Sequence, residues 1–381
     1  MTLEKSFKKF SFVVASRIVN SGSHALFYII FVFFMTPEEY GNLSYIIALA
    51  GTFSIISRFG LPYSSAIFQS KNEEEKANQI NFLAIITTSI AAIILIPINL
   101  FAAILSLGTS LFLMNFFNLL GQRKYKEQFK LVCIQGILMI IIPLVLYIPL
   151  GISGVMLGLI ASNVLPSISY LRLIKISKNF SKIKNTSKVL FNNFGVDAST
   201  NLPKMIDKLL IVPILGFSTV GIYQFNLQVL LALEVIPTAL HSFLLPEESQ
   251  GKNRNKIALG VFGLISSVTI FIIILVPHAI PIILPEYSKG IQSMQIMILA
   301  IIPITMSHII NAKLQAREST TVGYSAIVRI GSLLLFIGIF APLFEQIGLA
   351  ISVVLSSIAY TIYLLIVYYK SKYEKRDLRY G

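Results

Sequence analysis

The stretch "TNLPKMIDKLL" (200–210) holds the residues on which the interpretation of the whole chain depends. Lys204, Asp207 and Lys208 lie within five positions of one another. A run of 25 residues without a charged side chain, 209–233, begins at the next position. The three charges therefore belong either to a polar loop that precedes a long apolar helix or to the helix itself, and the rest of the sequence decides between the two.

The composition is that of a membrane protein. The chain is 55% hydrophobic and 13% charged, whereas soluble domains have roughly 25% charged residues. A membrane span needs about 20 mostly apolar residues. Residues 77–122 and 131–171 each hold two such lengths without a charge, and 257–285, 290–312 and 346–369 hold one each. We expect an all-α polytopic protein of the plasma or inner membrane.

Twelve transmembrane helices are predicted. They are expected at 11–35, 41–68, 79–98, 102–121, 129–149, 152–174, 188–216, 221–245, 256–277, 290–312, 322–343 and 347–370. With the N-terminus in the cytoplasm, 25 of the 31 Lys and Arg residues fall in cytoplasmic segments and only Lys289 lies outside. The positive-inside rule then predicts that both termini are cytoplasmic. The net charge of +14 is thus a topology signal, and we expect membrane lipids and no nucleic acid as partners.

The chain is expected to form two six-helix lobes. The basic segment "KISKNFSKIKNTSK" (175–188) lies near its middle. We therefore predict an N-lobe at 1–174, a cytoplasmic linker at 175–187, and a C-lobe at 188–381 that ends in a short basic tail. "TPEEYGNLSY" (36–45) corresponds to "FSTVGIYQF" (217–225), with Gly41 matching Gly221 at a spacing of 180. Such a duplication predicts a substrate site where the halves meet.

The first of these repeated segments also has a local interpretation. Thr36 is suited to the N-cap of a helix, Pro37 to its first position, and Glu39 lies three residues after the cap. This spacing predicts a capping box that starts the helix, and it favours a structural role over a functional one.

Five basic residues remain inside the predicted spans. They are Arg17, Arg58, Lys204, Lys208 and Arg329. A charge at the membrane centre costs at least roughly 2.5 kcal/mol, so such residues face a cavity, a partner or the interface. The topology therefore places the opening stretch inside the helix 188–216, with its charges in the membrane.

Helical spacing groups several of these residues into polar faces. One face of the first helix carries Arg17, Ser21, His24 and Tyr28, and one face of the helix 188–216 carries Asp197, Asn201, Lys204 and Lys208. Asp207 points about 80° away from the second face, toward a neighbouring helix. Glu234 lies in the middle of the helix 221–245, three residues before Pro237.

Two interpretations of these groups stay open. In the first, Lys and Arg extend toward the interface, Asp207 forms a structural ion pair, and His24 and His308 are hydrogen-bonded packing residues. In the second, the basic residues line a hydrated cavity that binds an anion arriving from the cytoplasm, such as a lipid phosphate or diphosphate headgroup. The acidic residues Asp197, Asp207 and Glu234 would then hold a coupling proton or sodium ion, or neutralise the bases when the site is empty.

The chain resembles the polysaccharide flippases of the O-antigen (Wzx) type in the multidrug/oligosaccharidyl-lipid/polysaccharide exporter superfamily. The resemblance covers nearly the whole chain and rests on the order and spacing of five segments. They are "TPEEYGNLSYIIAL" (36–49), "RFGLPYSSAIF" (58–68), "DKLLIVPILGFSTVGIYQFNLQ" (207–228), "ALHSFLLPEESQ" (239–250) and "QIGLAISVVLSSIAY" (346–360). The base that follows the aspartate at 207 is Lys208, where the family usually has Arg.

The resemblance implies two six-helix lobes around a central cavity and alternating access for a polyprenyl-(di)phosphate-linked sugar. It also implies that cationic residues on the first helices of each lobe contact the substrate. We therefore predict a substrate-binding set made of Arg17, His24, Arg58, Asn201, Lys204, Lys208 and Arg329. The expected protein is a monomer without a cofactor or metal, coupled to a proton or sodium gradient.

Two other function classes fit the sequence less well. An ion-coupled multidrug exporter of the same fold would need acidic cavity residues, and the first six predicted spans contain no Asp or Glu. An integral-membrane glycosyltransferase or polymerase usually needs a large extracytoplasmic loop, whereas the longest outside loop is "PHAIPIILPEYSKG" (277–290). No P-loop or zinc-protease motif is present, so we expect a transporter rather than an enzyme.

Overall fold

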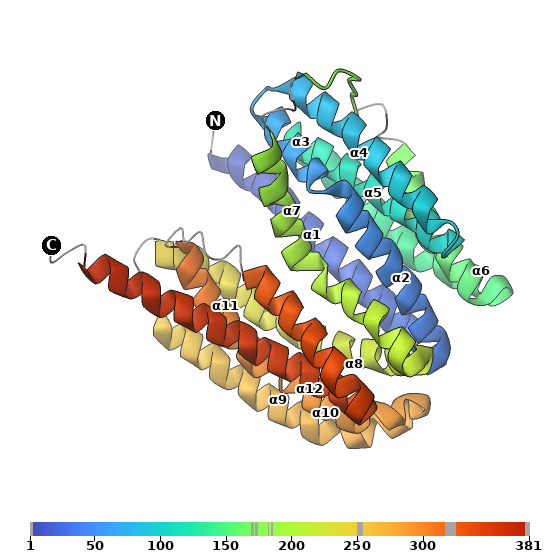
Figure 1. Cartoon of the computed structure of the whole chain (residues 1–381), viewed down its shortest axis with the longest axis vertical. Coiled ribbons are helices and arrows are strands. Elements are labelled where there is room, and N and C mark those ends of the chain that lie inside the picture. The colour runs from blue at the N-terminus through green and yellow to red at the C-terminus, as the bar shows by residue number, and fades with distance from the viewer. Residues whose placement is uncertain are drawn as a thin grey trace. The chain divides into compact units, whose positions relative to one another are not determined.

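The computed structural model of the chain describes residues 3–168, 171, 174–181, 183, 186–249, 254–316 and 325–377. The secondary structure in these ranges is helical, and the helices are joined by short loops and turns (Figure 1). It divides into two compact units by its internal contacts. The first unit is Met1–Phe31 with Tyr45–Ile206, and the second is Val32–Ser44 with Asp207–Gly381. Eight helical segments in the described ranges are long and apolar enough to cross a membrane.

The first unit contains seven helices or parts of them. They are α1 (Leu3–Val32), α2 (Pro37–Arg58), α3 (Leu61–Ser70), α4 (Glu74–Leu95), α5 (Leu100–Gly121), α6 (Tyr125–Ile168) and α7 (Ser187–Asn201). Helices α3, α4 and α5 lie side by side, α6 packs against α5, and α7 packs against α3 (Figure 1).

The second unit is built around three long apolar helices and shorter ones between them. Its elements are α8 (Pro203–Ser249), α9 (Asn255–Ile283), the 3-10 helix η2 (Pro285–Gly290), α10 (Ile291–Ile298), α11 (Ile301–Ala316) and α12 (Ser325–Asp377). Helix α12 packs against both α10 and α11, and α9 packs against α10, α11 and η2.

Helix α6 folds back on itself. Its backbone leaves the helical region at Gly151, where φ is 56°. A Cβ atom on Gly158 would overlap the backbone of Pro143. Residues 15 positions apart in a straight helix are about 22 Å apart, so this contact requires two antiparallel limbs. The positive φ explains why residue 151 is a glycine, because a residue with a side chain would be strained in this conformation.

Helices α8 and α12 reverse in the same way. Helix α8 turns at Gly216, where φ is 78°, and the hydroxyl of Tyr223 reaches the carboxylate of Asp207 at 2.8 Å. Helix α12 turns at Glu345, and a Cβ atom on Gly348 would overlap the carbonyl oxygen of Phe340. These three turns coincide with the predicted gaps at 150–151, 217–220 and 344–346, to within one residue.

Three predicted helices are interrupted in the structure. The helix expected at 41–68 breaks where Phe59 and Gly60 have positive φ values of 44° and 70°. The helix expected at 188–216 breaks at Leu202, and the one expected at 290–312 breaks between α10 and α11. Each of the last two breaks precedes a proline, at 203 and 303, because proline cannot donate the backbone hydrogen bond that would continue the helix.

The capping box at the start of α2 is confirmed. The backbone N–H and the hydroxyl of Thr36 both donate to Oε2 of Glu39, at 3.0 and 3.1 Å, and the N–H of Glu39 donates to the Thr36 hydroxyl at 3.3 Å. Pro37 is the first residue of α2, as predicted. Thr36 and Glu39 of the repeated segment 36–45 therefore have a local structural role.

The two glycines matched by the internal repeat contact each other reciprocally. A Cβ atom on Gly41 would overlap the carbonyl oxygen of Phe217, and a Cβ atom on Gly221 would overlap the carbonyl oxygen of Pro37. Both pairs lie in the second unit. Since residues 37 and 217 are separated by the same 180 positions as Gly41 and Gly221, the contact has the symmetry that a duplicated unit would produce.

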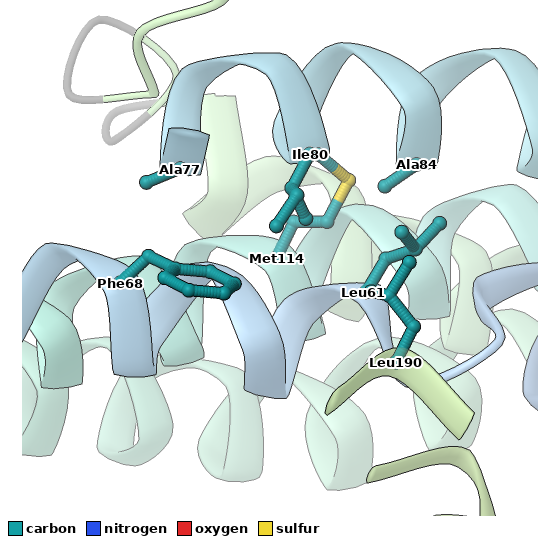
Figure 2. Packing of buried hydrophobic residues seen from close by; sticks show 7 residues of the cluster. All are labelled: Leu61, Phe68, Ala77, Ile80, Ala84, Met114 and Leu190. Carbon is teal, nitrogen blue, oxygen red and sulfur yellow. The ribbon is translucent and has the colours of Figure 1, made fainter. Parts of the chain in front are cut away.

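A buried apolar cluster joins α7 to the helices that precede it (Figure 2). Its members come from α3, α4, α5 and α7 and are Leu61, Phe68, Ala77, Ile80, Ala84, Met114 and Leu190. Through Leu190, the segment that follows the basic loop packs into the first unit. The division by contacts therefore falls after Ile206, whereas the lobes predicted from the sequence were divided at 175–187. The predicted lobes describe a duplication in the sequence, which a division by contacts does not test. The two six-helix lobes therefore stay a prediction.

Candidate functional site

A buried ion pair in the first unit joins two residues for which different roles were predicted. Nη2 of Arg58, at the end of α2, lies 3.1 Å from Oδ2 of Asp197 on α7, and the two side chains are 4% and 3% exposed. Nη1 of Arg58 donates to Ser54, whose hydroxyl lies 2.9 Å from that of Ser110 on α5. The amide of Asn201 donates to the other oxygen of Asp197 at 2.8 Å.

Contacts around the pair position α7 against the α2–α3 junction. The rings of Phe59 and Phe194 stack with centroids 4.5 Å apart. The amide of Asn193 donates to the hydroxyl of Ser64 at 2.8 Å. A Cβ atom on Gly60 would overlap the backbone of Phe194, so the glycine allows α7 to approach. The break at Phe59–Gly60 thus creates the surface on which Asp197 meets Arg58.

The arrangement gives each charge a partner in a site where an isolated charge would be costly. Removing one member of a buried pair leaves an uncompensated charge, which costs roughly 3–5 kcal/mol. The network thus brings together three of the predicted site residues, Arg58, Asp197 and Asn201. Chemically, Arg58 offers a guanidinium fork suited to phosphate whenever Asp197 is displaced or protonated.

A second buried group lies in the hairpin of α8. Oδ1 of Asp207 accepts from the backbone N–H of Lys208 at 2.8 Å and from its Nζ at 3.1 Å. Oδ2 of Asp207 accepts from the hydroxyl of Tyr223, on the opposite limb, at 2.8 Å. The Nζ of Lys208 also lies 5.8 Å from the centroid of the Tyr223 ring. The structural ion pair expected for Asp207 is present, but its base is the adjacent Lys208 rather than a residue on another helix.

Other predicted residues are exposed on their helices. Lys204, in the first turn of α8, is exposed, and so are Arg17 and His24 on α1. The opposite side of α1 packs on α6, where Ser23 abuts Gly136 and Phe12 contacts Phe129. The polar face predicted for the first helix is therefore directed away from α6.

The remaining predicted residues lie in the second unit. The guanidinium of Arg329 lies 5.6 Å from the ring centroid of Tyr360, across the turn of α12. Glu234, on the second limb of α8, lies 3.3 Å from Nε2 of His308 on α11. The structure thus divides the predicted set into separate groups, and the role of each group in substrate or ion binding stays a prediction.

Sequence reasoning did not identify several residues of these groups. Ser54 and Ser110 support Arg58, Tyr223 supports Asp207, and His241 lies beside His308. Helical spacing offered a signal for two of them, because Ser54 lies four residues before Arg58 and His241 lies seven after Glu234. Tyr223 and Ser110 lie across a turn or on another helix, where spacing along one helix carries no information.

Comparisons with known proteins agree with this architecture. An uncharacterized membrane protein of Methanocaldococcus jannaschii is 26% identical over 300 residues, which cover 69% of this chain and 72% of that protein. The solved structure of the lipid II flippase MurJ, in an inward closed conformation, has a TM-score of 0.70 at 17% identity and covers 94% of this chain and 87% of that one. An inward-facing multidrug resistance MATE family transporter of the MOP superfamily has a TM-score of 0.61 at 14% identity, over 91% and 99% of the two chains.

The structural likenesses show the fold, which is that of the MOP-superfamily transporters. The apolar helices and the archaeal relative show an integral membrane protein. One protein family, described as polysaccharide biosynthesis protein, matches residues 6–246, which are more than half of the chain. The chain is therefore a member of the polysaccharide biosynthesis protein family with the fold of a MOP-superfamily transporter.

Proposed function

We propose that this protein is an alternating-access flippase that moves a lipid-(di)phosphate-linked oligosaccharide from the cytoplasmic to the outer leaflet. The observation that carries the proposal is the family match over residues 6–246 in a chain with a flippase-like fold. The proposed substrate is a polyprenyl-(di)phosphate-linked sugar, because such a lipid is both an intermediate of polysaccharide synthesis and a molecule that must cross the membrane. The protein acts as a monomer in the plasma or inner membrane and carries out no covalent chemistry.

The proposed topology has twelve spans with both termini in the cytoplasm. Support comes from the eight apolar segments, three of which fold back at Gly151, Gly216 and Glu345 and so count twice. Helix α1, which is 30 residues long, adds the twelfth. The distribution of Lys and Arg favours this orientation over its inverse.

The proposed substrate contact begins at the exposed basic residues. Arg17 on α1 and Lys204 on α8 both have exposed side chains, which an anionic headgroup can approach from solvent. Arg58 is held by Asp197. Asp197 therefore neutralises Arg58 while the site is empty. A phosphate oxygen that replaces the carboxylate would recruit Arg58, and Asp197 would then take up a proton so that no uncompensated charge remains in the membrane.

The experiment measures translocation by purified protein in proteoliposomes, with a fluorescent polyprenyl-diphosphate-linked disaccharide as the probe. Arg17→Ala and Lys204→Ala are each expected to reduce the rate at least about tenfold, since loss of one charged hydrogen bond costs roughly 1.5–3 kcal/mol. The double variant should be inactive but still inserted in the membrane.

The matched control is Lys76→Ala, which removes a partly exposed basic residue paired with Glu73 at the start of α4. It should leave translocation unchanged. Full activity in the Arg17→Ala/Lys204→Ala double variant would contradict the proposal. Transport of an organic cation without transport of the lipid probe would instead favour the multidrug exporter.

A further inference from the structure

Three titratable side chains in the second unit form a continuous line. Oε1 of Glu234 on α8 lies 3.3 Å from Nε2 of His308 on α11. The ring of His308 lies 5.8 Å from that of His241, centroid to centroid. Nε2 of His241 is buried and has no hydrogen-bond partner among the described residues. These three residues, Glu234, His308 and His241, are called the acid–imidazole line below.

The line extends along one face of α8. Glu234 and His241 are seven residues apart, which places them on the same face of the helix and about 10 Å from each other. His308 bridges this distance from α11, because it contacts both. In the proposed orientation α8 approaches the cytoplasm toward its C-terminal end, so Glu234 lies near the middle of the membrane and His241 lies nearer the cytoplasmic side.

The charged groups of the neighbouring elements make other contacts. Glu247 of α8 pairs with Arg254 before α9, and Lys313 of α11 donates to Asn255 of α9. Glu248 lies at the C-terminal end of α8 and Lys256 at the N-terminal end of α9, where the side chain of Lys256 is exposed.

Helix α12 contributes Arg329, which contacts Tyr360. Tyr360 packs with Ile310 and Leu314 of α11, whereas Ile309 and Ala312 pack with Leu240 and Leu244 of α8. Arg329 therefore lies by a different face of α11 from the acid–imidazole line. Gln315 is the polar neighbour of His241.

The chemistry of the line fits a proton better than a metal cation. Hard cations prefer oxygen ligands, and two of the three groups are imidazoles. Within the described residues, these side chains do not converge in the way that a metal site requires. Histidine is the side chain that gains and loses its charge most readily near neutral pH. A carboxylate beside an imidazole can therefore hold one proton as a neutral ion pair.

We infer that the acid–imidazole line carries the coupling proton of the flippase, an inference that rests on the proposed function. One proton taken up by the Glu234–His308 pair converts carboxylate plus neutral imidazole into carboxylate plus imidazolium. The imidazolium then gives one proton to Nε2 of His241, and His241 releases one proton to the cytoplasmic side. The line returns to its starting charge after each cycle, and the coupling assigned to it is one proton inward for each lipid moved outward.

The test uses proteoliposomes with the fluorescent polyprenyl-diphosphate-linked disaccharide, assayed with and without an imposed pH gradient. For one proton per lipid, a gradient of one pH unit should drive an accumulation of about tenfold in the wild-type protein. His308→Gln replaces the imidazole by an amide, which can donate a hydrogen bond to Glu234 but cannot take up a proton. This variant should lose the gradient-driven accumulation while probe exchange without a gradient persists.

The control variant is His278→Gln, because His278 is on α9 and bonds to the carbonyl of Ile274. It should accumulate the probe as the wild-type protein does. Gradient-driven accumulation by His308→Gln, or accumulation driven by sodium and not by pH, would overturn the proton line alone. Absence of any exchange by the wild-type protein would overturn the flippase proposal, and the proton line with it.

Discussion

Arg58 and Asp197 are 139 positions apart in the chain, yet they form one buried pair. Helical spacing predicted the face on which Asp197 lies but not its partner, because spacing along one helix carries no information about which helix packs against it. A similar limit applies to Lys208. Its position predicted a place on the Lys204 face, whereas its long side chain reaches the carboxylate of its neighbour Asp207. The residue types of the site were thus predictable, and the pairing was not.

The Arg58–Asp197 pair predicts a specific pattern of stability. Arg58→Ala should destabilise the protein by roughly 3–5 kcal/mol, because the Asp197 carboxylate is left buried and uncompensated. Replacing both residues, as in Arg58→Met with Asp197→Leu, should restore most of that loss. Thermal unfolding of the purified protein in detergent measures both effects.

The control for this comparison is again Lys76→Ala, whose partly exposed pair with Glu73 contributes less than about 1 kcal/mol. If Arg58→Ala unfolds at the temperature of the wild-type protein, the pair does not hold α7 against the α2–α3 junction. If the double variant is no more stable than Arg58→Ala, the loss comes from packing rather than from the unpaired charge.

At the scale of helices, the turns between spans were predicted and the breaks within a predicted span were not. The gap before 152 follows from the length of the uncharged run 131–171, since its 41 residues are enough to cross the membrane twice. The gaps before 221 and 347 lie in the predicted helical stretches 188–245 and 322–370, which are likewise too long for one crossing. The break at Phe59–Gly60 lies just before Pro62, and its positive φ values accompany the close approach of α7. A single glycine or proline near a span does not by itself decide where a helix ends, so the length of the stretch predicted an unbroken helix.

The reciprocal glycine contact predicts that two distant substitutions have the same effect. Gly41→Ala and Gly221→Ala each place a Cβ atom on the backbone of the other helix, so each should lower stability by roughly 1–3 kcal/mol. Gly263→Ala on α9 is the matched control, because its Cβ atom would meet nothing within 4 Å. This control should be neutral or stabilising by up to about 1 kcal/mol. Thermal unfolding compares the three, and a large loss at only one of the two contact glycines would contradict a symmetric contact.

At the scale of the whole molecule, the sequence predicted the fold class through quantities that the membrane itself imposes. Apolar run length and the distribution of Lys and Arg reflect the bilayer rather than any particular packing. The grouping of residues 187–206 with the first unit was not predictable in this way, because it depends on contacts such as those of Leu190. Membership of the polysaccharide biosynthesis protein family agrees with the resemblance found in the sequence.

The orientation of the molecule is the property on which the direction of transport depends, and the chain is well suited to measuring it. Cys133 is the only cysteine, so Cys133→Ser provides a background without thiols. Single cysteines can then replace Lys71 and Asn255, predicted inside, Lys289, predicted outside, and Ile98, the outermost residue of the predicted span 79–98. All four are exposed. A membrane-impermeant maleimide should label the outer pair in intact cells and the inner pair only after permeabilisation.

The opposite labelling pattern would invert more than the topology. Helix α1 runs from the predicted inner side, and Arg17 lies in its first half, so an inverted molecule would present this residue near the outer leaflet. Arg17 would then contact lipid headgroups of the outer leaflet, and the proposed transport would run inward. Labelling of Lys71→Cys in intact cells would therefore contradict both the twelve-span orientation and outward transport, whereas the predicted pattern places Arg17 on the side where lipid-linked sugars are assembled in the proposed function.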